Sequence, residues 1–283
     1  MTEASSGTVQ PTDSPYALGL TIGYAGAGFA GFARQPGQRT VQGCIEDALR
    51  IILRREVDTV GAGRTDAGVH ALGQVMSFAG TGDEPDEDSF LRSLNALAGG
   101  GITVRGVRRA IPGFSARFDA TCREYRYRIV SGSVPPLFLG DVAWWTTKPL
   151  DLEAMREGAA HLLGEHDFRS FCVTPSAVGK RTFRRLDAIE VYEEQQLGEP
   201  HVVVRVTGNA FLHSMVRVIV GTLVEVGTGL RDPAWVADAR SACAREAAGP
   251  TAPAHGLTFW SVTYRDGVWL PLVICDQVRG GGS

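Results

Sequence analysis

The strongest constraint on the fold is an order of strand-like and helix-like segments that occurs twice along the chain. In the first half, residues 17–26 alternate as a strand, and residues 40–54 have a helical apolar face that begins at a threonine cap. A strand signal at 74–78, a helix at 83–97 with an acidic first turn, and a strand at 102–107 follow. This half is therefore predicted to be a β-α-β-β-α-β unit.

The second half repeats this order. Its expected elements are strands at 124–130, 186–192, 201–207 and 258–265, and helices at 151–163, at 211–226 and from 232. The sequence thus predicts an α/β (α+β) fold of two similar domains with antiparallel or mixed sheets and an active-site cleft between them. The predicted boundaries are a disordered tail over 1–15, an N-terminal domain over 16–111, a C-terminal domain over 112–268 and a tail over 269–283.

The net charge of −3 by itself argues weakly against a nucleic-acid partner. However, only Lys148 and Lys180 are lysines, and the arginines that make up the other basic residues gather at 105–109, 117–128 and 180–185. These clusters favour a basic face on an acidic body, whereas ordinary solvated faces in an arginine-rich protein are the alternative.

Several classes of protein are disfavoured. No run approaches the roughly 20 apolar residues that span a bilayer, and the first fifteen residues lack the features of a signal peptide. The five cysteines are scattered and form no C-x-x-C pair, which argues against a disulfide framework or a zinc site. A reducing cytoplasm is the expected setting.

The most unusual stretch is GAGRTDAGVHALGQV, residues 61–75. Its spacing matches neither a phosphate loop nor a dinucleotide-binding loop, and one acid is too few for a calcium loop. His70 lacks a second histidine at helical spacing and is expected to be a packed, hydrogen-bonded residue. What remains is Asp66 in a tight loop, with Arg64 close enough to pair with it. An oriented, ionised aspartate serves as nucleophile or base, whereas a structural Asp–Arg pair is the alternative.

GRTDAGVHALGQV (63–75) resembles the signature of the tRNA pseudouridine(38–40) synthases, the tRNA pseudouridine synthase A family. Further blocks resemble this family in the same order along the chain, over roughly residues 17 to 267. They are RTVQG (39–43), FSARFDATCREYRYRI (114–129), GNAFLHSMVRVIVGTLVEVGTG (208–229) and Pro253-Ala254-x-Gly256-Leu257.

The resemblance implies a pseudouridine synthase fold and a homodimer that needs no cofactor and no metal. The implied substrate is tRNA, at uridines 38, 39 and 40 of the anticodon arm. Asp66 is then the catalytic aspartate, and Tyr125 lies against the target uracil. Arg64 and Arg217 pair with or orient Asp66, and Leu257 forms part of the apolar wall of the base pocket. The arginine clusters are expected to line a tRNA-binding face.

Three segments depart from the family pattern. Residues 31–35 replace G-W-Q-x-Q, residues 97–102 replace L-P-x-D-I, and His213 stands where a tyrosine is common. Tyr125 and Tyr127 are expected on opposite faces of their strand, with one of them in the core. Two other functions are considered. One is an RNA-binding module in which Asp66 is structural, and the other is a nucleoside hydrolase-like glycosidase, which usually employs a further carboxylate or a metal.

Overall fold

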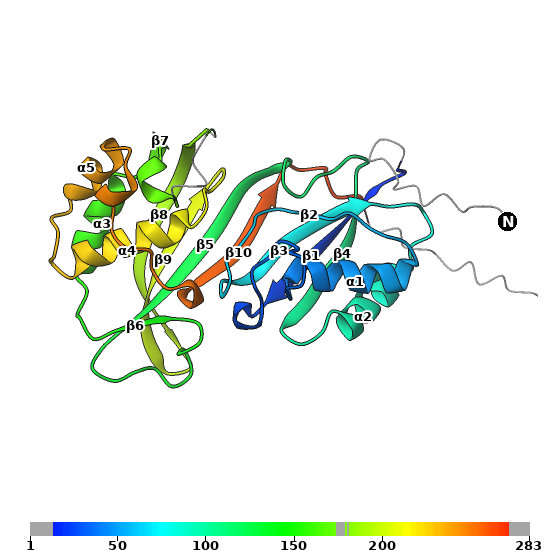
Figure 1. Ribbon diagram of the computed structural model, residues 1–283, viewed down its shortest axis with the longest axis horizontal. Coiled ribbons are helices and arrows are strands. Elements are labelled where there is room, and N and C mark those ends of the chain that lie inside the picture. Colours follow the sequence, from blue (N-terminus) through cyan, green and yellow to red (C-terminus); the bar gives the residue numbers. More distant parts are fainter. Residues whose placement is uncertain (1–13, 174–178, 180, 272–283) are drawn as a thin grey trace, which may run out of the picture.

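One continuous sheet runs through both halves of the protein in the computed structural model, which describes residues 14–173, 179 and 181–271 (Figure 1). Its strands are β1 (Ala17–Tyr24), β2 (Val60–Gly61), β3 (His70–Ala79), β4 (Ile102–Ala110), β5 (Ala120–Ser131), β6 (Trp144–Thr146), β7 (Gly164–Asp167), β8 (Phe183–Gln196), β9 (Glu199–Gly208) and β10 (Leu257–Tyr264). The helices are α1 (Val41–Leu53), α2 (Glu87–Leu97), α3 (Leu152–Ala160), α4 (Met215–Gly227) and α5 (Trp235–Ser241). The strand order is β4-β1-β3-β10-β5-β9-β8-β7, with β2 against β3 and β6 against β5.

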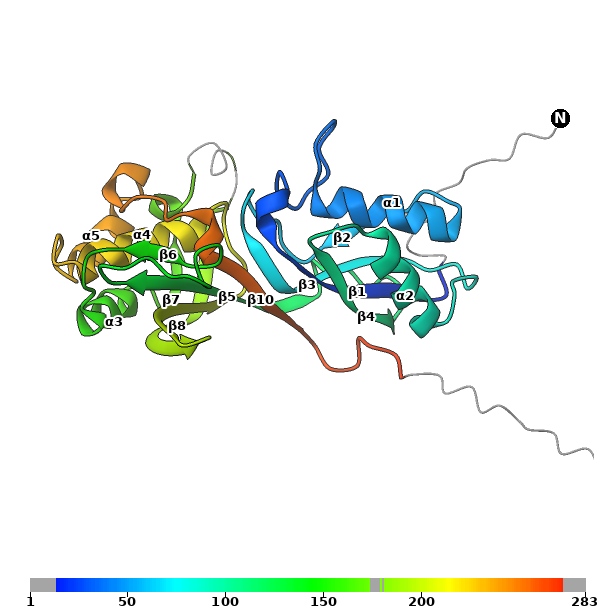
Figure 2. The same ribbon diagram turned by 90° about the horizontal axis from the view of Figure 1, so that it is seen from below.

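The first half has the predicted β-α-β-β-α-β order. Strand β1 lies between β3 and β4 and is antiparallel to both. Helices α1 and α2 cover one face of these strands (Figure 2). The Thr40 hydroxyl accepts a hydrogen bond from the amide of Gly43 and caps α1, as predicted. Helix α1 then buries an apolar stripe against the sheet, which includes Ile45 and Leu49.

Helix α2 begins at Glu87, four residues later than predicted, because Glu84 is used for a tertiary contact. The Glu84 carboxylate is buried and accepts hydrogen bonds from the Tyr16 hydroxyl at 2.7 Å and from Arg55 at 3.1 Å. Burial alone would raise the pKa of Glu84, but the hydrogen bonds from Tyr16 and the amides of Thr81 and Gly82 outweigh it and hold the pKa below its usual value.

Glu84→Gln is expected to reduce the acid sensitivity of the fold. Because the pKa of Glu84 is lower in the folded state, its contribution to the free energy of unfolding is complete above about pH 4.5 and is lost as the pH falls below that value. Denaturant titrations from pH 7 to pH 3 would show a smaller loss for Glu84→Gln than for wild type. Asp83→Asn, at an exposed neighbour, is the matched control and should follow wild type. Parallel curves for Glu84→Gln and wild type would contradict the prediction.

The second half is built around the long strands β5, β8 and β9. Strands β8 and β9 form a hairpin whose turn residues, Leu197 and Gly198, have φ values of 53° and 82°. Two left-handed residues suit the twist of a two-residue hairpin, so the predicted turn is present and both strands are longer than predicted. Helix α4 is apolar on nearly all sides and is packed inside this half, which is why its sequence lacks a polar face.

The two halves are joined by the last strand. Strand β10 pairs in parallel with the start of β3 and antiparallel with β5, so it lies between the halves (Figure 1). The sequence predicted two sheets side by side, whereas pairing of β10 with β3 and β5 joins the strands of both halves into a single sheet. Within the described residues, no helix is long and apolar enough to cross a bilayer.

The ends of the fold differ from the predicted tails. Ser14 is buried and donates hydrogen bonds to the carbonyls of Tyr16 and Gly80. At the other end, the amide of Leu270 donates to the carbonyl of Arg109, and Trp269 packs beside Phe114. These residues belong to the fold because their apolar and polar groups find partners on the first half. The rest of the predicted tails, 1–13 and 272–283, lies outside the described residues.

Candidate active site

The loop at residues 62–69 joins β2 to β3 at the junction of the two halves, and it needs its glycines for close packing. A Cβ on Gly61 would lie 2.4 Å from the Phe32 ring, and one on Gly63 would lie 3.2 Å from the Phe259 ring. Gly68 has φ of +81°, a conformation that L side chains rarely adopt. The loop is therefore closely packed against both halves, and Asp66 is presented from a defined backbone.

Hydrogen bonds hold this loop from both sides. The Thr65 hydroxyl is 2.8 Å from the Tyr24 hydroxyl, and the Thr65 carbonyl accepts from the amide of Phe32 at 3.1 Å. The Gln74 side chain donates to the carbonyl of Gly63 at 2.7 Å. Phe32 belongs to the segment 31–35 that departs from the family pattern, so this departure lies directly against the Asp66 loop.

The Asp66 carboxylate meets three donors from the start of α4. Arg217 Nη1 lies 2.7 Å from Oδ2, the Ser214 hydroxyl donates to the same oxygen at 2.7 Å, and His213 Nε2 lies 3.1 Å from Oδ1. The Asp66 side chain remains 21% exposed, so it is held in place and still open to a ligand. A carboxylate accepts about four hydrogen bonds, and two of these positions are taken by Arg217 and Ser214, so Asp66 keeps acceptor capacity for a substrate.

Arg217 also holds the wall of the site. Its Nε donates to the carbonyl of Ala252 at 2.8 Å, so one guanidinium joins α4, the Asp66 loop and the segment leading to β10. The structure thus places Arg217 against Asp66. Arg64 lies elsewhere: its side chain is exposed and makes no hydrogen bond or ion pair with the described residues. The predicted Arg64–Asp66 pair is wrong, because Arg217 and Ser214 take the carboxylate and Arg64 lies at the surface.

Tyr125 on β5 lies in an aromatic cluster next to Asp66. Its ring centroid is 4.9 Å from that of Phe211 and 4.9 Å from that of Phe259, with both pairs edge to face. Burial raises the pKa of the Tyr125 phenol above its usual range, and the charge of Asp66 raises it further, so the phenol stays neutral.

Tyr127 and Leu257 extend the same apolar surface. Tyr127 is fully buried, its hydroxyl donates to the carbonyl of Pro253 at 2.8 Å, and it faces the buried Leu257 across the β5–β10 pair. The expectation that Tyr125 and Tyr127 face opposite sides is wrong, since residues two apart on a strand share a face. A Cβ on Gly256 would lie 2.5 Å from the Tyr127 ring, which explains the glycine before Leu257.

Two residues of the site, His213 and Ser214, were not predicted from the sequence. His213 was noted only as a departure from the family pattern, and Ser214 was not singled out. Ser214 has φ of 58° and ψ of 11°, a left-handed conformation that is costly for a residue with a Cβ. Their position directly before a long apolar helix was the available signal, because a polar residue there is placed at a helix start.

The arginine clusters are only partly exposed. Arg123 is buried and donates to the carbonyls of Ala62, Arg117 and Asn209, so it supports the loops around the site and does not line a surface. Arg128 is buried as well. Among the described residues, no group of three or more histidine, cysteine or acidic side chains is arranged to hold a metal ion.

Comparison with known proteins decides the family. The sequence pattern described as tRNA pseudouridine synthase matches residues 21–97 and 159–265, which include the Asp66 loop, α4 and β10. The chain belongs to the tRNA pseudouridine synthase family. It is similar to tRNA pseudouridine synthase A of Brevibacillus brevis, at 44% identity over 87% of this chain and 99% of that protein.

Other members of the family support this assignment. tRNA pseudouridine synthase A of Frankia casuarinae is 43% identical over 89% of this chain and 91% of its own length, and that of Bacillus subtilis is 41% identical over 87% and 98%. A solved Cbf5-Nop10-Gar1 complex contains a chain that matches with 16% identity and a TM-score of 0.32, covering 78% of this chain and 57% of that one. The family match and the identities to the tRNA pseudouridine synthase A proteins show that the protein is an isomerase of the tRNA pseudouridine synthase family, and its mixed sheet with helices gives the predicted α/β fold class.

Proposed function

We propose that this synthase converts uridine to pseudouridine at positions 38, 39 and 40 of the tRNA anticodon arm, with Asp66 as its catalytic aspartate. The observation that carries the proposal is a single carboxylate, 2.7 Å from Arg217, beside an apolar cluster that includes Tyr125. A glycosidase that uses two carboxylates is disfavoured, because the partners of Asp66 are an arginine, a serine and a histidine.

The chemistry requires one anionic group near the sugar. The bond between N1 of the base and the sugar breaks, the base turns, and a bond forms from C5 of the base to the same sugar carbon. C5 then gives up its hydrogen as a proton and N1, freed from the sugar, takes up a proton, so the product is an isomer of the substrate. Asp66 assists at the sugar, by attack on the anomeric carbon or by removal of a neighbouring proton. Its remaining acceptor capacity is available for this step.

The target base must leave its stack to reach Asp66. Tyr125 and Leu257 are both largely buried, with 7% and 5% of each residue exposed, and we place the flipped uracil against the apolar wall to which they belong. Arg217 orients Asp66 through an ion pair at 2.7 Å. Arg64 is an exposed residue of the loop that carries Asp66. We therefore assign it a contact with the RNA backbone in place of the predicted pair with Asp66.

We further propose that the synthase acts in the cytoplasm as a homodimer without a cofactor, and that the chain divides into domains at 16–111 and 112–268. The RNA substrate and the scattered cysteines support the cytoplasm. The resemblance to the family supports the dimer, and equilibrium sedimentation of the purified protein tests it.

Tritium release from tRNA with uridine labelled at C5 tests the function, because C5 loses its hydrogen only when it becomes the glycosidic carbon. We expect release from an unmodified transcript with uridines at 38, 39 and 40. No release is expected when these three are replaced by cytidine. Tight binding of the unmodified tRNA without any release would contradict the proposal and leave an RNA-binding module.

Ser214→Ala is expected to lower turnover about 10- to 100-fold, because a hydrogen bond to a charged group is worth roughly 1.5–3 kcal/mol. Ser214→Gly should lose the same activity, since it also lacks the hydroxyl. Glycine accepts the left-handed backbone, so its Tm should exceed that of Ser214→Ala. Single-turnover rates and thermal melts separate these effects. Equal melting temperatures for the two variants would show that the left-handed backbone at Ser214 is not strained. Full activity of Ser214→Ala would show that the hydrogen bond from the hydroxyl to Asp66 is not needed for turnover.

A further inference from the structure

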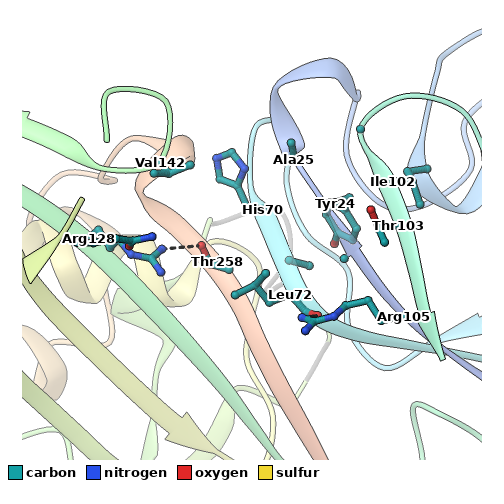
Figure 3. Close-up of a pocket in the computed structure, with 14 residues that line it drawn as sticks. Tyr24, Ala25, His70, Leu72, Ile102, Thr103, Arg105, Arg128, Val142 and Thr258 are labelled. Carbon is teal, nitrogen blue, oxygen red and sulfur yellow. Dashed lines mark hydrogen bonds between the residues drawn. The ribbon is translucent and has the colours of Figure 1, made fainter. Parts of the chain in front are cut away.

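A second pocket, of about 610 Å³, lies at the junction of the two halves and does not include Asp66. Figure 3 shows Arg128 and Thr258 on one side of it, Thr103 and Arg105 on the other, and His70 between them. None of its lining residues carries a carboxylate. The charge of Glu194 acts on Arg128, but Glu194 does not line the pocket. The charged side chains that line the pocket, Arg105 and Arg128, are therefore both positive.

The pocket lies on the face of the sheet opposite the aromatic cluster, at the same end of the strands as Asp66. Arg128 and Thr258 directly follow Tyr127 and Leu257, so they point to the other face. Strand β3 begins at His70, only four residues after Asp66, and four residues span at most about 14 Å. The Asp66 site and this pocket are thus no more than about 14 Å apart at His70. A single RNA molecule can reach both.

His70 presents an unused donor to this region. Its side chain is buried, with 7% of the residue exposed, and its Nδ1 accepts the amide hydrogen of Gly26 at 3.1 Å. The neutral ring therefore carries its proton on Nε2, which makes no hydrogen bond with the described residues. Burial lowers the pKa of His70, and interactions with the backbone of Asp141 and His255 raise it in part.

Arg128 is a buried cation that forms no ion pair with the described residues, although the charge of Glu194 acts on it. Only 9% of the residue is exposed, its Nη1 donates to the Thr258 hydroxyl at 3.3 Å, and its Nε has no acceptor among the described residues. The face of Trp260 lies 5.6 Å from the guanidinium carbon. A charge removed from water is destabilising unless it is paired, so this arrangement is expected where an anion binds.

We propose that this pocket binds a phosphate group of the RNA backbone, at a nucleotide other than the target uridine. A phosphate supplies the several acceptor oxygens that Arg128, His70 and Thr258 require. Arg105 at the rim adds a second positive charge; its Nη1 donates to the carbonyl of Leu72. The inference rests on the proposed function for its choice of RNA, since a free phosphate would satisfy the same donors.

Arg128→Met tests the pocket, because methionine fills much of the same volume without the charge. We expect the Kd for an unmodified tRNA transcript to rise about 10- to 100-fold, and the slope of log K against log[salt] to fall by about one. The single-turnover rate at saturating RNA should stay at the wild-type value. The Tm without RNA should not fall, since an unpaired buried charge is removed.

Arg126→Met is the matched control, because Arg126 lies two residues away on the same face of β5 but already pairs with Glu124 at 2.8 Å. It should change the Kd for tRNA much less. Inorganic phosphate added to the apo-protein distinguishes the sources of the anion. If phosphate raises the Tm of wild type but not of Arg128→Met, while both bind tRNA equally, the pocket holds a free phosphate and the RNA assignment is overturned.

Two other outcomes would also overturn the inference. One is a lower Tm of Arg128→Met with an unchanged Kd, which would make Arg128 a structural residue. The other is altered sedimentation of Arg128→Met without RNA, which would mean that a second copy of the chain fills the pocket. Failure of the proposed function is seen separately, as wild type that binds tRNA but releases no tritium.

Discussion

Asp66→Asn is expected to lower the single-turnover rate of pseudouridine formation by at least about 10⁴-fold, with tRNA binding close to that of wild type. Losses of this size follow when a group that takes part directly in the reaction is removed. Asparagine has nearly the same shape and keeps one oxygen for Arg217 and Ser214, but it is neither a nucleophile nor a base. Tritium release from C5-labelled tRNA and a filter-binding Kd on the same samples measure the two effects.

Asp187→Asn is the matched control for this substitution. Asp187 also lies 2.8 Å from an arginine, Arg185, but it is on β8 and outside the site. It should retain the wild-type rate. An Asp66→Asn variant that keeps more than about a tenth of the wild-type rate would show that Asp66 only stiffens its loop, which is the structural alternative drawn from the sequence.

Arg217→Met is expected to give the second largest effect, a fall in single-turnover rate of about 10²–10³-fold, the range for one preorganised electrostatic contact in an active site. The substitution removes the ion pair with Asp66 and also the hydrogen bond to the carbonyl of Ala252. The Tm should therefore fall as well. Arg217→Lys keeps the charge but not the two-sided reach of the guanidinium, so it should recover part of the rate and little of the Tm.

The double variant Asp66→Asn/Arg217→Met separates pairing from independent roles. If Arg217 acts by positioning Asp66, the second substitution should lower the rate little further once Asp66 is changed, because the two residues act as a unit. If instead the rate of the double variant falls by the product of the two single losses, Arg217 acts independently of Asp66, by direct contact with the RNA.

The local order of the chain could be predicted because its signals are local. Helix α1 begins after Thr40 and α3 after Asp151, as their side chains indicated, and both caps accept the expected amide hydrogens. The boundary of α2 was wrong because Glu84 forms contacts with Tyr16 and Arg55, which are distant in sequence. The sequence of an acidic run does not indicate which of its residues will be buried by partners that are distant in the chain.

The donors around Asp66 were less accessible to prediction. A short separation favoured Arg64, yet the partners that the structure brings to Asp66 follow it by about 150 positions. The resemblance to the family named Arg217, but neither periodicity nor spacing identified His213 and Ser214. Their contact depends on the angle at which α4 enters the core.

The sequence by itself determined the repeated order of strands and helices, the glycine loop that carries Asp66, and the family. These follow from periodicity, turn chemistry and motif, which act over a few residues. Only the tertiary structure decided that β10 joins the halves into one sheet, that Arg64 takes no part in the pairing predicted for Arg217 and Asp66, and that Arg128 is buried without an ion pair. Each of these depends on strand pairing across the junction, where packing and desolvation outweigh distance along the chain.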